Sequence, residues 1–69
     1  MLEPRFCKFT DIDTGKQFVL NIGCIARITE TTLIKKKEDR KIQCRKIYLT
    51  DGQEFFVEES LDDIYDKII

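Results

Sequence analysis

The chain has 69 residues, with 12 basic and 13 acidic side chains, a net charge of −1 and no histidine. This length allows one domain, residues 1–69, with a small core of marginal stability. The lack of histidine removes the commonest metal ligand and acid–base group, and no apolar run approaches the ~20 residues of a membrane span. We therefore expect a non-enzymatic domain that has no metal or other cofactor and that gains stability by self-association.

Three widely spaced cysteines occur without any C-x-x-C pair: Cys7, Cys24 and Cys44. An odd number at this spacing argues against a zinc site and against a disulfide framework. Apolar neighbours around each cysteine are typical of buried free thiols in a reducing compartment. Because the Met1–Arg5 segment also does not resemble a signal peptide, we expect a cytoplasmic protein.

The first predicted elements are two strands joined by a turn. Residues 5–10 form the first strand, and Asp11–Gly15 is rich in turn-forming residues. The second strand, residues 17–22, shows the period-2 alternation of a strand with one buried face. The apolar members of this alternation are Phe18, Leu20 and Ile22.

A third strand is predicted to begin at Cys24 and to continue through β-branched residues to residue 34. Its alternation places Cys24, Ala26 and Ile28 on one face. Gly23, just before this strand, is a natural position for a bend in the sheet.

Residues 35–41 are polar and charged and are predicted to form the tip of a long hairpin. The fourth strand, residues 42–50, alternates with mixed character on both faces, which suggests that its basic end projects beyond the core. One face carries Gln43, Arg45, Ile47 and Leu49, and the other carries Ile42, Cys44, Lys46 and Tyr48.

Asp51-Gly52 lies between two alternating runs and predicts a two-residue type I′ hairpin turn. The fifth strand follows at residues 53–58. Phe55 and Val57 point to one face, so Phe56 must lie on the second face, which either the helix or another copy would cover.

The hydrophobic period changes to that of a helix after residue 60. Ser60, with Asp63 three residues later, is typical of a helix N-cap. The predicted helix presents one apolar face, which we expect to lie on the sheet: Leu61, Ile64, Tyr65 and Ile68. The predicted architecture is therefore mainly β, a five-stranded antiparallel meander or small open barrel with one short C-terminal helix.

Charge is distributed unevenly along this fold, with a basic segment followed by an acidic end. The basic candidates for partner binding are Lys35, Lys36, Lys37, Arg40, Lys41, Arg45 and Lys46. The acidic end contains Asp51, Glu54, Glu58, Glu59, Asp62, Asp63 and Asp66.

Three interpretations of the basic segment remain open. It can be a solvated hairpin tip, it can bind an acidic protein surface, including the acidic end of a neighbouring copy, or it can bind nucleic acid. Glu38 and Asp39 interrupt the basic run, and the sequence pI of about 5.3 is unlike that of a dedicated nucleic-acid binder.

No residue pattern predicts catalysis. The cysteines and Ser60 have no histidine to activate them, and Ser60 is already expected to cap the helix. The carboxylate pairs Glu58-Glu59 and Asp62-Asp63 lack the spacing of a calcium loop, so we expect them to have structural or solvated roles.

Two segments of the chain resemble the FlbD-type small flagellar and swarming-motility proteins. The first contains Phe9, Thr14–Asn21, Ile25, Ile28 and Glu30-Thr31, and the second contains Ile47–Leu61, Asp62-Asp63-Ile64 and Lys67-Ile68. The ending, strand, Asp-Gly, strand, Glu-Ser-Leu and helix, is also similar to part of LytTR-type DNA-binding domains and to many small phage or mobile-element proteins.

The resemblance covers about two thirds of the chain and implies a regulatory or structural protein of bacterial or phage origin rather than an enzyme. The basic segment from Leu33 to Lys46 is longer than the corresponding hairpin of the FlbD-type proteins. A partner that binds this segment would therefore not be implied by the resemblance.

Overall fold

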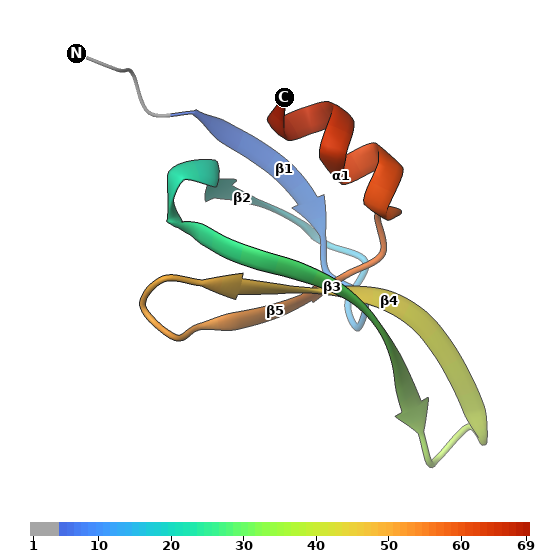
Figure 1. Cartoon of the computed structure of the whole chain (residues 1–69). Coiled ribbons are helices and arrows are strands. Elements are labelled where there is room, and N and C mark those ends of the chain that lie inside the picture. The colour runs from blue at the N-terminus through green and yellow to red at the C-terminus, as the bar shows by residue number, and fades with distance from the viewer. Residues whose placement is uncertain (1–4) are drawn as a thin grey trace.

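The computed structural model describes residues 5–69 (Figure 1). Met1–Pro4, which include most of the segment judged unlike a signal peptide, lie outside the described residues. The elements are β1 (Phe6–Thr10), β2 (Gln17–Asn21), a 3-10 turn η1 (Ile22–Cys24), β3 (Ile25–Lys35), β4 (Arg40–Leu49), β5 (Glu54–Val57) and α1 (Leu61–Ile68). The prediction of a mainly β fold with five strands and a C-terminal helix is confirmed for this part of the chain.

The strands form two antiparallel sheets, so the predicted single meander or barrel is wrong. One sheet contains β1 and β2, and the other has the order β3-β4-β5. β2 does not pair with β3 because the chain turns through η1, where the Asn21 side chain accepts a hydrogen bond from the Gly23 N–H at 3.0 Å. This turn carries the chain from one sheet to the other, at the glycine where the sequence predicted a bend.

The two sheets meet where β1 ends. Asp11 and Val57 form a bridge, the Ile12 N–H donates to the Phe56 carbonyl at 3.1 Å, and the Glu58 N–H donates to the Thr10 carbonyl at 3.1 Å. The end of the first sheet is thereby held against β5.

The core lies between the sheets and is closed by α1. Phe9, Ile47, Val57 and Ile64 are buried, one each from β1, β4, β5 and α1. The apolar side chains packed around them are only half-buried: Cys7, Phe18, Leu20, Ile25, Ile28, Leu49 and Phe55. The fully enclosed core is small, as expected for a chain of this length.

Helix α1 begins as predicted but buries less than predicted. The Ser60 hydroxyl accepts a hydrogen bond from the Asp63 N–H at 3.1 Å, which confirms the N-cap. Of the predicted apolar face, Ile64 is buried and Ile68 half-buried, while Leu61 and Tyr65 are exposed. The helix packs on the core side of the sheet. It therefore does not cover the second face, on which Phe56 lies.

The β4–β5 connection differs from the predicted type I′ turn. The Gly52 N–H donates to the Leu49 carbonyl at 3.1 Å, and the Leu49 N–H donates to the Gln53 carbonyl at 2.9 Å. These bonds enclose a three-residue loop in which Gly52 has a φ of +92°, whereas Asp51 does not have the positive φ that type I′ requires.

The predicted alternation is confirmed in β4 but fails at the start of β3. Opposite residues of antiparallel strands share a face, and the register from Arg45↔Val57 to Tyr48↔Glu54 agrees with the predicted faces. In β3 an irregularity between Ile25 and Arg27 shifts the register. Cys24 lies in η1 and is exposed, and Cys7 is half-buried, so the prediction of three buried thiols holds only for Cys44.

Candidate functional site

A two-stranded arm projects from the second sheet. β3 pairs with β4 from Ile25↔Leu49 to Lys35↔Arg40, but β5 pairs with β4 only between Arg45 and Tyr48. Residues 31–44, which we call the hairpin arm, therefore extend beyond the end of β5. At about 3.3 Å per residue, the arm projects by about 17 Å. Figure 1 shows the arm pointing away from α1.

The shape of the molecule reflects this projection. The described chain measures 49 × 23 × 19 Å and has a radius of gyration of 12.8 Å. A compact domain of this length would have a radius of gyration of about 11 Å. The arm is thus a protruding element, which is consistent with the predicted extension of the fourth strand beyond the core.

The loop of the arm is shorter than predicted. β3 continues to Lys35 and β4 begins at Arg40, so the loop contains only the four residues between them. The Glu38 N–H donates to the Lys35 carbonyl at 3.2 Å, and Asp39 has a φ of +49°, a left-handed conformation that aspartate adopts more readily than most residues.

Four of the seven predicted basic residues are exposed together at the end of the arm. We call Lys36, Lys37, Arg40 and Lys41 the basic tip. Glu38 lies between them, with a carboxylate oxygen 3.6 Å from the guanidinium of Arg40. Exposed ion pairs of this kind are weak and easily exchanged, so this contact leaves the cations of the tip exposed to solvent.

Lys35 lies at the base of the loop and has a partner within the fold. Its ammonium nitrogen is 3.7 Å from the Asp13 carboxylate, which comes from the β1–β2 loop. Lys35 shares a face with Arg40, its cross-strand neighbour. The ion pair therefore connects the β1–β2 loop to the face of the arm on which Lys35 and Arg40 lie.

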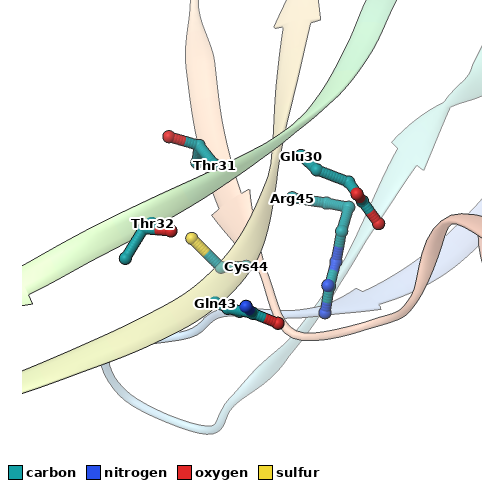
Figure 2. Close-up of a pocket in the computed structure, with 6 residues that line it drawn as sticks. All are labelled: Glu30, Thr31, Thr32, Gln43, Cys44 and Arg45. Atoms are coloured by element: carbon teal, nitrogen blue, oxygen red, sulfur yellow. The ribbon is translucent and has the colours of Figure 1, made fainter.

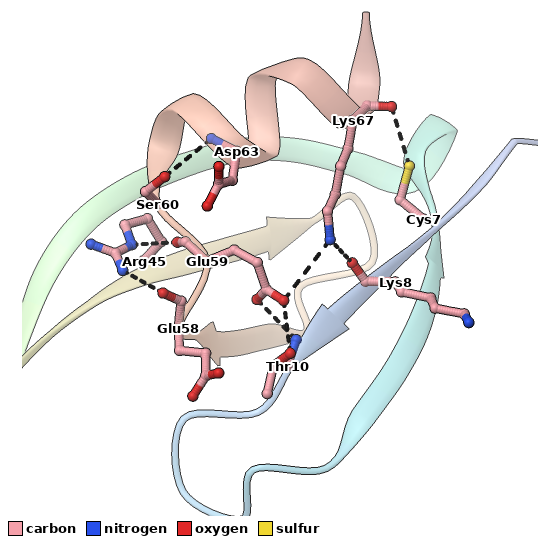
Figure 3. A network of polar contacts seen from close by, with 9 residues as sticks. All are labelled: Cys7, Lys8, Thr10, Arg45, Glu58, Glu59, Ser60, Asp63 and Lys67. Atoms are coloured by element: carbon pink, nitrogen blue, oxygen red, sulfur yellow. Dashed lines mark hydrogen bonds and ion pairs between the residues drawn. The ribbon is translucent and has the colours of Figure 1, made fainter.

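Arg45 bonds to the segment that follows β5. Its Nε donates to the Glu59 carbonyl at 2.6 Å and its Nη2 donates to the Glu58 carbonyl at 2.7 Å (Figure 3). These short charge-assisted bonds fix the segment between β5 and α1 onto β4.

Lys46 is likewise engaged inside the fold. Its ammonium nitrogen is 3.2 Å from the Glu54 carboxylate and lies 4.9 Å from the ring centre of Tyr48 and 5.4 Å from that of Phe56. The hydrogen bond with Glu54 raises the pKa of Lys46 above its ordinary value. Lys46 also covers part of the Phe56 ring. On the second face of the sheet, where Phe56 lies, part of the cover is therefore a side chain of the sheet itself.

The structure contains a polar network that the sequence reasoning missed (Figure 3). The Glu59 carboxylate accepts hydrogen bonds from the Thr10 N–H at 2.9 Å and the Thr10 hydroxyl at 2.8 Å, and it lies 3.9 Å from the Lys67 ammonium. Lys67 in turn donates to the Lys8 carbonyl at 2.5 Å. No local pattern marks Glu59, because Thr10 and Lys67 meet it only after the chain has folded.

A shallow polar hollow of about 180 Å³ lies along the arm near Cys44 (Figure 2). Glu30, Thr31, Thr32, Gln43, Cys44 and Arg45 line it. Burial raises the pKa of the Cys44 thiol, so the thiol stays protonated and is a weak nucleophile. The hollow therefore offers hydrogen-bonding groups but no activated nucleophile.

Within residues 5–69, no three cysteine, aspartate or glutamate side chains converge as metal ligands. In the same part of the chain, no helix is long and apolar enough to cross a membrane.

Comparison of this chain with known proteins identifies no relative. No protein-family model matches this chain, and no curated protein or solved structure matches it either. The resemblance to FlbD-type proteins therefore stays a prediction. The projecting arm and its basic tip are the features of the structure that suggest a function.

Proposed function

We propose that this protein is a small non-enzymatic interaction module that binds an acidic protein surface through its basic tip. The main support for this proposal is the projecting arm, which places four exposed cations at the end of a two-stranded ribbon. Groups on such a projection lose little solvation until a partner approaches, and clustered cations speed the association with an acidic surface.

We further propose that the module works as a homo-oligomer. Several large apolar side chains are exposed, including Ile34 at 65%, Tyr65 at 60% and Ile69 at 70%. With only a small enclosed core, burial of this surface against another copy would supply stability that the monomer lacks. A regulatory or structural role in the cytoplasm of a bacterium, or in a phage, is part of the same proposal and rests on the FlbD-type resemblance.

The test measures binding of a defined polyanion. The fluorescently labelled protein is titrated with poly-L-glutamate at low and high salt, and binding that weakens at high salt is expected. The double variant K36E/K37E should lose this binding. The matched control K8E/K16E reverses two exposed lysines outside the arm and should retain it.

Equal losses in both double variants would show that binding follows net charge and not the basic tip. That result would overturn the proposal, as would failure of the wild-type protein to bind poly-L-glutamate at low salt.

A second candidate is a nucleic-acid-binding regulator that uses the same arm. The favouring observation is its two-stranded form, because the major groove of duplex DNA admits a β-ribbon. A random duplex replaces poly-L-glutamate in the same titration. Binding to the duplex alone, with a steep salt dependence that K36E/K37E reduces, would favour the regulator over the protein-binding module.

A further inference from the structure

Helix α1 carries an apolar stripe that the fold leaves uncovered. Leu61 and Tyr65 of the helix and Ile69, its C-cap residue, follow one another at intervals of four residues and are 38%, 60% and 70% exposed. Residues four apart lie on the same side of a helix, so these side chains form one strip, which we call the helix stripe. It borders the buried side of the helix, where Ile64 enters the core.

Negative charge borders the other side of the helix stripe. Asp62 and Asp66 each follow a stripe residue by one position, which rotates them by about 100° around the helix, and both are exposed. The only cation of the helix, Lys67, is turned toward β1, where it donates to the Lys8 carbonyl at 2.5 Å. The surface of α1 is therefore apolar with an acidic border.

The end of the hairpin arm has the complementary character. An open hollow of about 480 Å³ lies beside Ile34 and is lined by Lys35, Lys36, Lys37 and Glu38. Ile34 is 65% exposed. The lysine side chains can contribute apolar stems to such a hollow while keeping their ammonium groups in water. This surface is apolar with a basic border.

The two surfaces cannot meet within one molecule, because the arm projects away from α1 (Figure 1). We propose that the arm end of one molecule binds the helix stripe of a second copy. Tyr65 of one copy would enter the hollow beside Ile34 of the other, with Lys36 and Lys37 facing Asp62 and Asp66. This inference rests on the proposed function, for which it identifies the acidic partner as a second copy of the chain.

Each molecule offers one arm end and one helix stripe, so a two-fold arrangement forms both contacts at once. Such an isologous dimer closes on itself, as most soluble homo-oligomers do. The apolar contact supplies most of the attraction, and the two charged borders select the orientation.

A charge-swap experiment tests the pairing. The double variant K36E/K37E makes the arm end acidic, and D62K/D66K makes the helix border basic. In sedimentation equilibrium at low salt, wild-type protein should dimerise and each variant alone should remain monomeric. An equimolar mixture should form a heterodimer, since its acidic arm end meets the basic helix and its basic arm end meets the acidic helix.

A second variant guards against misfolding of the charge-reversed helix. Tyr65→Ser removes an exposed ring and leaves every charge in place, and circular dichroism verifies that the helix remains. Aromatic anchors dominate interfaces, so we expect the dimer dissociation constant to rise about tenfold or more. The matched control Phe6→Ser removes an equally exposed ring from β1 and should leave the dissociation constant unchanged.

A wild-type monomer at millimolar concentration, a dimer unaffected by Tyr65→Ser, or a mixture that stays monomeric would each overturn the inference. If the monomer still binds poly-L-glutamate through the basic tip, the inference and the homo-oligomer part of the proposal fail, while the proposed binding of an acidic surface stands. If it binds neither itself nor the polyanion, both fail.

Discussion

The Glu59 carboxylate connects three segments that are distant in the sequence. It accepts two hydrogen bonds from Thr10 at the end of β1 and lies 3.9 Å from Lys67 in α1. Its own carbonyl accepts from Arg45 in β4 at 2.6 Å. Because the side chain is only 13% exposed, water cannot readily replace these partners.

We predict that Glu59→Ala lowers the free energy of unfolding by about 2–3 kcal/mol, since hydrogen bonds to a charged group contribute about 1.5–3 kcal/mol. Glu59→Gln keeps one carbonyl oxygen for Thr10 and should lose less. Urea denaturation monitored by circular dichroism measures both changes. The control Glu58→Ala removes an exposed side chain and should leave stability almost unchanged. Equal losses at positions 58 and 59 would contradict a supporting role for Glu59.

At the scale of the elements, the β4–β5 hairpin depends on one backbone conformation. Gly52 has a φ of +92°, and the loop bonds from Gly52 to Leu49 and from Leu49 to Gln53 close around it. A Cβ atom built on Gly52 would meet no heavy atom within 4 Å. Any loss of stability on substitution must therefore come from the left-handed backbone and not from a steric clash.

Replacing Gly52 by alanine is expected to cost about 1–2 kcal/mol of unfolding free energy, because non-glycine residues are disfavoured in the left-handed region. Asparagine tolerates that region better, so Gly52→Asn should cost less. Urea unfolding of the three proteins gives the ranking. A Gly52→Ala variant as stable as the parent would show that the loop does not need its positive φ.

At the scale of the whole molecule, the arm and the core should differ in local stability. Cys44 and Ile47 of β4 are fully buried, whereas residues 32–35 and 40–43 form a two-stranded ribbon without a buried side chain. An isolated two-stranded hairpin is marginal in water, so the arm can open without unfolding the core.

Amide hydrogen exchange should therefore show fast exchange in the outer arm and slow exchange in the β4 segment that pairs with β5. Protein at low concentration is expected to show this gradient most clearly. If a second copy binds the arm end, protection of the arm should rise with protein concentration. Uniform protection from Lys41 to Tyr48 would contradict independent opening of the arm.

The sequence alone determined the features that depend on neighbours along the chain. Alternation predicted the faces of β4 and β5, and Ser60 with Asp63 predicted the helix cap that the structure contains. These signals are readable because period and capping arise from residues only two to four positions apart.

Tertiary structure decided how the segments meet. Seven clustered cations are predicted as candidates for partner binding, and the structure exposes four of them in the basic tip, while Lys35, Arg45 and Lys46 contact other segments of the fold. The split into two sheets, the exposed helix stripe and the role of Glu59 likewise depend on contacts between distant segments. Local sequence patterns do not predict such contacts, because burial and pairing depend on which distant segments lie together in the folded chain.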